Sequence, residues 1–205
     1  QNFNTVLYTG NGSTNAITVG FQPDFVWGKD RSGTDHNHLF DAIRGTNQRL
    51  ISNTNAAENT ENNCLDSFDT NGFTLGSNTG LNNNNDLHVA WNWNMGGTTA
   101  SNTNGSITSS IRANPSAGQS IVTYTGTGSN ATVGHGLSSV PGFIAVKTRN
   151  NTGDWMVFYG DNTDFLKLNE YNDTEDLAAV WNDTSPTSSV FTIGTNTDVN
   201  VDGRT

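Results

Sequence analysis

The sequence predicts an all-β protein made of two tandem antiparallel β-sandwich units, of jelly-roll or concanavalin-like type, related by internal duplication. Three observations predict this class. Apolar residues recur at every second position of short segments, which is the period of a strand with one buried face. Clusters of Asn, Gly and Thr, which are typical of tight turns, separate these segments. Blocks of sequence also return in the same order later in the chain.

The repeat consists of three pairs of matching blocks, shifted by 116 or 118 positions. They are Val6–Gly12 with Val122–Gly128, Pro23–Lys29 with Pro141–Lys147, and Phe73–Gly76 with Phe191–Gly194. Because the blocks are collinear, duplication explains them better than chance does. We therefore expect a first unit over residues 1–97 and a second unit over residues 120–205. Residues 98–119 are expected to link them, and Ser106–Arg112 could form an extra strand there.

Each unit is expected to hold about seven or eight short strands, enough for two facing sheets. The first strand follows the alternation of Phe3–Tyr8, a second one covers Phe25–Trp27, and a late one covers Leu87–Trp93. In the late strand Trp91 and Trp93 share the apolar face, so we expect both rings to be buried.

The second unit lacks its last expected strand. The repeat aligns Asn82 with Asn200, so the counterpart of Leu87–Trp93 would follow Thr205. A sandwich without this strand exposes an apolar groove and unpaired backbone groups. We therefore expect the strand to come from backbone beyond Thr205 or from a neighbouring chain. Gln1 begins the chain without a Met or a leader, which indicates a chain cut or processed from something longer.

The composition argues against several kinds of partner. Nine basic against nineteen acidic residues give a formal net charge of -10, which repels nucleic acid and anionic lipid surfaces. No apolar run approaches the roughly 18 residues of a membrane span. Cys64 is the single cysteine, so neither an intrachain disulfide nor a cysteine zinc cage can form. We expect no nucleic-acid partner and no membrane insertion.

One stretch resembles part of a calcium site. Asp198, Asn200 and Asp202 precede Gly203 with the spacing of the first half of a calcium loop. The corresponding stretch of the first unit, Gly80–Asn85, lacks the carboxylates. A hairpin turn is therefore the favoured interpretation, and no cofactor is expected.

A second cluster could serve a metal or acid–base chemistry. His36 and His38 lie near Asp35 and Asp41, and alternate residues of a strand project to the same side. A surface hairpin of polar residues has the same pattern, and we favour that interpretation.

Two tryptophans are candidates for sugar-stacking platforms. Trp155 follows Asp154, and Trp181 precedes Asn182 and Asp183. A flat apolar ring covers the CH face of a pyranose, while amide and carboxylate groups bond its hydroxyls. We expect these two rings to be the more exposed ones. Five Asn residues also begin acceptor patterns for N-glycosylation. They are Asn11, Asn104, Asn130, Asn172 and Asn182.

No catalytic set emerges from the sequence, and we expect the protein not to be an enzyme. No serine occupies a Gly-x-Ser-x-Gly turn. A glycosidase would need two acids aimed into one cleft, whereas the acids here cluster in turn-like sequence. Examples are Asp66, Asp69, Asp161 and Asp164. Asp41 and Arg44 are predicted to form an ion pair or turn lock, partly exposed and contributing at most about 1 kcal/mol.

Five strings of the sequence are similar to a family of repeated domains in structural proteins of marine bacteriophages. They are Val6–Gly12, Gly20–Trp27, Leu39–Gly45, Gly72–Gly76 and Ala90–Trp93. The resemblance covers nearly the whole chain. It implies a non-catalytic component of a virion appendage, such as a tail fibre or fibrous decoration, on the virion or at an extracellular surface. Its partners would be copies of itself, other appendage proteins and surface glycans.

Two other functions fit the same features. One is a secreted carbohydrate-binding module, which the two candidate tryptophans favour. The other is an extracellular filament subunit whose fold is completed by a neighbour's strand, which the missing strand favours.

Overall fold

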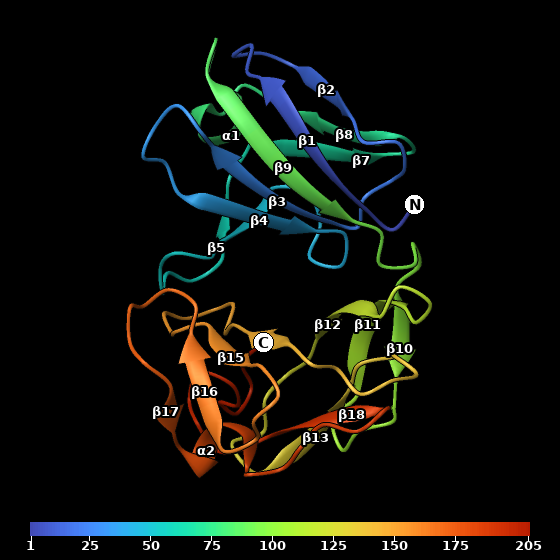
Figure 1. The fold of residues 1–205 in the computed structure, drawn as a ribbon, viewed down its shortest axis with the longest axis vertical. Helices are drawn as coiled ribbons and strands as arrows, with labels where there is room; N and C mark the ends of the chain where they lie inside the picture. Colours follow the sequence, from blue (N-terminus) through green and yellow to red (C-terminus); the bar gives the residue numbers. More distant parts are fainter. The chain divides into compact units, whose positions relative to one another are not determined.

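The computed structural model describes residues 1–205 and consists mainly of short strands and turns (Figure 1). The expected all-β class with antiparallel sheets is confirmed. The chain divides into two compact units: unit 1 is residues 1–52 and 58–97, and unit 2 is residues 53–57 and 98–205. The two helices have four residues each, and neither is long enough to cross a membrane.

Unit 1 contains the first nine strands and one short helix. They are β1 (Phe3–Thr9), β2 (Asn15–Thr18), β3 (Phe25–Asp30), β4 (Asn37–Asp41), β5 (Gln48–Ile51), β6 (Asn59–Thr60), β7 (Leu65–Asp69), β8 (Gly72–Leu75), α1 (Thr79–Asn82) and β9 (Leu87–Trp93).

Two sheets of unit 1 pack face to face. A six-stranded sheet has the order β1-β9-β3-β4-β5-β6, and a three-stranded sheet has the order β2-β8-β7 (Figure 1). Val26 and Phe40 of the large sheet join Leu65, Phe73 and Leu75 of the small sheet in one buried cluster. This core between two sheets gives unit 1 its β-sandwich character.

β9 lies inside the large sheet, between β1 and β3. Its register with β1 runs from Phe3 opposite Trp93 to Thr9 opposite Leu87. Its register with β3 starts at Phe25 opposite the same Trp93. Both edges of β9 are therefore paired along most of its length.

Unit 2 contains the remaining strands and the second helix. They are β10 (Ala100–Asn102), β11 (Ser109–Asn114), β12 (Gln119–Thr123), β13 (Ala131–Gly134), β14 (Ile144–Val146), β15 (Met156–Phe158), β16 (Asp164–Lys167), β17 (Glu175–Asp176), α2 (Ala178–Trp181) and β18 (Val190–Ile193).

The sheets of unit 2 are smaller than those of unit 1. They have the orders β14-β15-β16-β17, β10-β11-β12 and β13-β18. Phe165, Phe191, Trp181 and Ile193 are buried in their shared core. The segment 98–119, expected to be a linker, folds into unit 2 as β10, β11 and the start of β12.

One buried asparagine in each unit ties a loop to the strands around it. In unit 1 the Asn82 side chain donates to the carbonyl of Gly76 at 2.7 Å and accepts from the Asn11 backbone N–H at 3.0 Å. In unit 2 the Asn200 side chain donates to the carbonyl of Gly194 at 2.7 Å. A buried amide satisfied by backbone groups holds a loop in one conformation.

Candidate functional site

The outer face of the large sheet in unit 1 carries an array of aromatic side chains. We call Phe3, Phe25, Trp27, Trp91 and Trp93 the aromatic ladder. They come from the adjacent strands β1, β9 and β3 and point away from the core, because the alternate residues of these strands belong to it.

The rings of the aromatic ladder touch across the strands. The Trp93 ring lies 5.0 Å from Phe3 and 5.1 Å from Phe25, measured between ring centroids. Trp91 and Trp27 meet edge to face, with centroids 6.3 Å apart. These separations lie within the range of stabilising aromatic pairs.

Apolar side chains next to the aromatic ladder extend this face. Leu7 is 63% exposed, Leu87 is 48% exposed, and Phe3 itself is 43% exposed. The four other rings of the ladder are half-buried. Because exposed apolar areas are typical of interaction surfaces, this face is the candidate site.

The expectation that Trp91 and Trp93 are core residues is wrong. His88, Ala90 and Asn92, the residues between them and before them, are the fully buried members of β9. Alternation in a strand shows that two faces differ, but it does not say which one meets the other sheet. Here the core accepts the smaller and polar residues, and the large rings lie outside.

The buried polar residues of β9 are held by local contacts. The Asn92 amide donates to the carbonyls of Asn4 at 3.2 Å and Ala90 at 3.0 Å. The His88 ring stacks on Tyr8, with centroids 5.2 Å apart and planes at 17°. Burial also lowers the pKa of His88 below its usual range, so the ring is uncharged at neutral pH.

His38 lies on the same inner face and is almost fully buried. Burial lowers its pKa to about 4, with a smaller contribution from the positive charge of Arg49. The surface-hairpin interpretation of the His36–His38 segment is therefore wrong for His38. No group of three or more His, Cys, Asp or Glu side chains is placed to hold a metal ion.

Asp41 and Arg44 form the predicted ion pair, which is confirmed. Arg44 also donates from Nη1 to the Glu58 carboxylate at 2.9 Å and from Nη2 to the Leu39 carbonyl at 3.1 Å. The pair is buried rather than partly exposed, with side-chain exposures of 3% for Arg44 and 5% for Asp41. Asp41 accepts in addition from the N–H of Ile43 at 3.0 Å, which locks the turn after β4.

The expectation that Trp155 and Trp181 are exposed rings is wrong. Trp155 is 8% exposed, and Trp181 is 2% exposed. Trp181 packs edge to face on Phe158 within the core of unit 2, with centroids 6.1 Å apart. Trp181 is the last residue of α2 and its ring faces the core, whereas the next two residues, Asn182 and Asp183, are exposed. Neither ring can serve as a stacking platform in this conformation.

Asn182 and Asp183 shape the turn that follows α2. Both adopt left-handed backbone conformations, with φ of 53° and 45°. The Asn182 N–H donates to the Ala178 carbonyl at 2.7 Å, and its side-chain oxygen accepts from Asn130 at 2.6 Å. The backbone bond of Asn182 is that of a helix end.

The stretch that resembles a calcium loop does not form one. Asn200 is 2% exposed, and its side chain bonds the backbone at Gly194, Ser129 and Thr127. Because its oxygen accepts from the Thr127 N–H at 2.7 Å, it is not oriented as a metal ligand between Asp198 and Asp202. The Asp198 carboxylate accepts a hydrogen bond from the Asp154 backbone instead.

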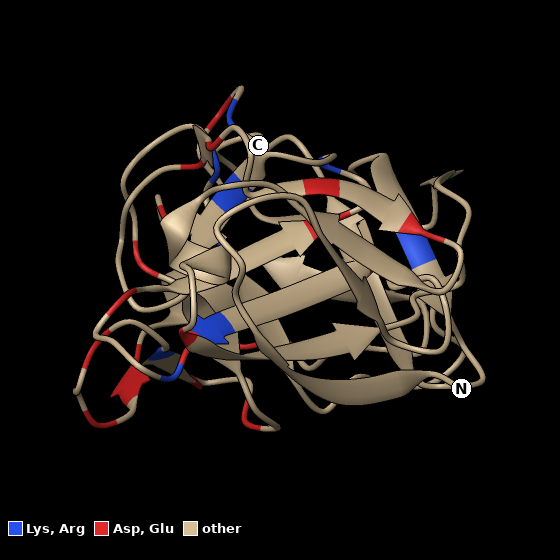
Figure 2. Cartoon of the chain, turned by 90° about the horizontal axis from the view of Figure 1, so that it is seen from above, with Lys and Arg blue, Asp and Glu red and all other residues tan.

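The remaining sequence candidates are surface features. All five glycosylation acceptors are exposed. They are Asn11, Asn104, Asn130, Asn172 and Asn182. Asp69 accepts hydrogen bonds from Ser67 and Thr74 at 2.7 Å, and Asp161 accepts from the Thr163 N–H at 3.0 Å. Figure 2 shows charged residues scattered along the chain, many of the acidic ones in loops.

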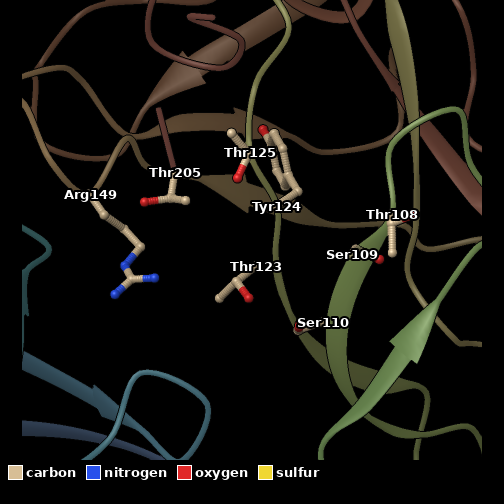
Figure 3. Close-up of a pocket in the computed structure, with 8 residues that line it drawn as sticks. All are labelled: Thr108, Ser109, Ser110, Thr123, Tyr124, Thr125, Arg149 and Thr205. Atoms are coloured by element: carbon tan, nitrogen blue, oxygen red, sulfur yellow. The ribbon is translucent and has the colours of Figure 1, made fainter. Parts of the chain in front are cut away.

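Unit 2 contains an open pocket of about 260 Å³ (Figure 3). Hydroxyl side chains dominate its walls, together with one arginine. The lining residues are Thr108, Ser109, Ser110, Thr123, Tyr124, Thr125, Arg149 and Thr205. No sequence motif pointed to this pocket, because its residues come from four separate segments.

Comparison with known proteins identifies the family. A family described as a domain of unknown function, DUF7483, matches residues 1–204. No curated protein and no solved structure matches the chain. Since the match covers nearly every residue, the chain belongs to the DUF7483 family.

Proposed function

We propose that this chain is a non-enzymatic structural or adhesive module, which acts by surface contact as part of a virion appendage such as a tail fibre. The observation that carries the proposal is the aromatic ladder. Five large rings lie together on the outer face of a six-stranded sheet, in a chain with a net charge of -10. The charge favours dispersion of the chain, and a cluster of exposed rings offers a place for apolar contact.

The second part of the proposal is that the two units are duplicated sandwiches of jelly-roll or concanavalin-like type. Matched hydrogen bonds support it. The Tyr8 hydroxyl donates to the Leu81 carbonyl at 2.9 Å, and the Tyr124 hydroxyl donates to the Val199 carbonyl at 2.7 Å. The offsets between these donors and acceptors are those of the sequence repeat, 116 and 118 positions.

Strand registers support the same duplication. In unit 1, Ile17 of β2 lies opposite Phe73 of β8. In unit 2, Val133 of β13 lies opposite Phe191 of β18. Tyr8 meets Phe73 edge to face at 6.5 Å, and Tyr124 meets Phe191 edge to face at 6.2 Å. A tandem unit of this kind suits an elongated particle component, which is built by repetition.

The side chains best suited to catalysis, Asp41 and His38, are occupied in structural contacts. This supports a non-enzymatic role. Asp41 is bonded to Arg44 and to backbone N–H groups, and His38 is shut inside the core. A general base must reach a substrate proton, which neither group does here.

A secreted carbohydrate-binding module is the second candidate. The exposed edge of the aromatic ladder, Phe3 beside Trp93, favours it because stacked pyranoses need adjacent flat rings. In this candidate function, sugars would stack on the rings of the aromatic ladder and not on Trp155 and Trp181, which the sequence suggested.

The test changes the aromatic ladder without touching the core. We expect the Phe3→Ser, Trp93→Ser double variant to lose self-association or glycan binding that the unchanged chain shows. Sedimentation velocity and a glycan array measure the two properties. The matched control is Tyr171→Ser, which removes one exposed ring from unit 2. A chain that neither associates nor binds a glycan, with or without the double substitution, would contradict the proposal.

A further inference from the structure

Three asparagines of the chain stand directly before a glycine. They are Asn11, Asn71 and Asn104, and all three are exposed. In an Asn–Gly pair the next backbone nitrogen reaches the side-chain amide most easily, because glycine carries no side chain that shields this nitrogen. The three pairs differ in how the fold holds the peptide group between the asparagine and the glycine.

The first pair is held by several hydrogen bonds. The Gly12 N–H donates to the Asn82 carbonyl at 2.8 Å. The Asn11 side chain donates to the Thr14 carbonyl at 3.0 Å and accepts from the Ser13 N–H at 2.8 Å. Both the nitrogen that could attack and the amide that it would attack are therefore fixed in unit 1.

The second pair lies at the turn between β7 and β8. The Asn71 carbonyl accepts from the N–H groups of Val19 at 2.8 Å and Gly20 at 3.2 Å. Gly72 is the first residue of β8, is buried, and lies opposite Asp69 of β7. The peptide group between Asn71 and Gly72 therefore turns only if these backbone contacts break.

The third pair lies in the bend after β10, and its peptide group is free of such bonds. Neither the Asn104 carbonyl nor the Gly105 N–H has a hydrogen-bond partner within the chain, and the Asn104 side chain has none either. The bend is anchored on both sides of this group. The Asn104 N–H donates to the Asn102 side chain at 2.9 Å, and the Ser106 N–H donates to the Thr132 hydroxyl at 2.9 Å. The peptide group can therefore turn while the bend keeps its place in unit 2.

The fold also requires glycine at position 105. A Cβ there would lie 2.2 Å from the carbonyl oxygen of Thr132, which is closer than such atoms approach each other in proteins. The same lack of a side chain leaves the Gly105 nitrogen unshielded. Packing against Thr132 therefore maintains a reactive Asn–Gly pair at an exposed position.

We propose that Asn104 is a site of spontaneous deamidation. The lone pair of the Gly105 backbone nitrogen attacks Cγ of Asn104 and forms a C–N bond. The bond from Cγ to the side-chain nitrogen breaks, and ammonia leaves with the proton that the Gly105 nitrogen loses. The product is a cyclic succinimide. Solvent water then opens the ring at either of its carbonyl carbons, which gives aspartate or isoaspartate without any oxidation or reduction.

Deamidation changes the surface of unit 2 in two ways. Either product carries a carboxylate at neutral pH, so the formal net charge falls by one, from -10 to -11. The position also loses the amide that begins the acceptor pattern of Asn104, Gly105 and Ser106. Deamidation and N-glycosylation of Asn104 therefore exclude each other.

The test follows all three pairs in the folded 205-residue chain, incubated at physiological temperature in neutral buffer. Mass spectrometry of proteolytic peptides measures the replacement of the amide NH2 by OH, and chromatography separates the aspartate and isoaspartate forms. Breaking one hydrogen bond slows a reaction by roughly two- to tenfold. Because more than one bond holds each of the other pairs, Asn104 should react at least about tenfold faster than Asn11 and Asn71.

Two controls separate the effect of the fold from that of the local sequence. In guanidinium chloride, which unfolds the chain, the three pairs should react at similar rates. Asn104→Gln should remove the acidic form that isoelectric focusing detects first, because the longer side chain closes a larger ring more slowly. Equal rates at the three pairs in the folded chain, or an early acidic form that persists in Asn104→Gln, would overturn the proposal. So would a folded chain whose Asn104 stays intact over the time in which the unfolded chain is largely converted.

Discussion

Acid should destabilise unit 1 through His38. The ring is buried, none of its nitrogens has a hydrogen-bond partner, and burial lowers its pKa from 6.5 to about 4. The positive charges of Arg49, His36 and Lys29 act in the same direction, and the Asp35 carboxylate opposes them.

The sign follows from proton linkage. Because the unfolded chain binds the proton near pH 6.5 and the folded chain only near pH 4, protons favour unfolding between these values. The stability from a neutral His38 is fully present above pH 6.5 and is lost as the pH falls through this window. A difference of about 2.5 pH units at about 1.36 kcal/mol each amounts to roughly 3 kcal/mol.

The assay measures the unfolding free energy of the unchanged chain and of His38→Leu by urea unfolding at several pH values. Amide exchange at the same pH values reports on unit 1 separately. Leucine keeps the volume near that of the ring but takes up no proton. The stability of the unchanged chain relative to His38→Leu should fall by roughly 3 kcal/mol from above pH 6.5 to about pH 4. Comparing the two chains cancels the titration of carboxylates that both share. The control is His36→Leu, two residues earlier at an exposed position, which should keep the acid sensitivity.

The result that would refute this reasoning is a His38→Leu chain whose stability falls with pH as steeply as that of the unchanged chain. In that case the acid sensitivity would belong to other groups, such as His88, whose pKa burial also lowers.

Three further predictions concern named contacts. Arg44→Met should destabilise unit 1 by about 3–5 kcal/mol, because it removes the guanidinium that pairs with the buried carboxylates of Asp41 and Glu58. The control Arg49→Met should cost at most about 1 kcal/mol, because the pair of Arg49 with Glu61 is more exposed. Equal losses of stability in urea unfolding would contradict this. Asn82→Ala should cost about 1–3 kcal/mol, because backbone groups of the loop lose their partner, and amide exchange at Asn11 should accelerate. Trp181→Ala should lower the unfolding free energy of unit 2 by about 3–5 kcal/mol and leave that of unit 1 unchanged, because the ring is buried in the core of unit 2. Site-resolved amide exchange measures both. A Trp181→Ala chain that keeps its full stability but loses binding of a ligand would show that the ring is exposed.

Local sequence patterns predicted some of the strands. The late strand was expected over Leu87–Trp93, and β9 has those bounds. Period-two alternation with β-branched and aromatic residues depends on neighbours along the chain, so it is readable without a fold. The ion pair of Asp41 and Arg44 was also predictable, because its two members are three residues apart in one turn.

The burial of single rings could not be predicted in the same way. Trp91 stands in an alternating apolar segment and Trp155 follows Asp154, yet Trp91 lies on the outer face and Trp155 is buried. Which side of a strand meets the second sheet depends on residues far away in the chain. The same holds for the aromatic ladder, which needs β1, β3 and β9 side by side.

By itself, the sequence determined the all-β class, a few strand positions and the blocks of the repeat, because each depends on local periodicity or on direct comparison of segments. Only the tertiary structure decided that β9 turns His88 and Asn92 inward and its tryptophans outward, and that 98–119 joins unit 2. It alone showed that the Thr205 carbonyl accepts from the Arg149 N–H. The physical reason is that sheet order and facing are set by contacts between residues dozens of positions apart, which no local pattern encodes.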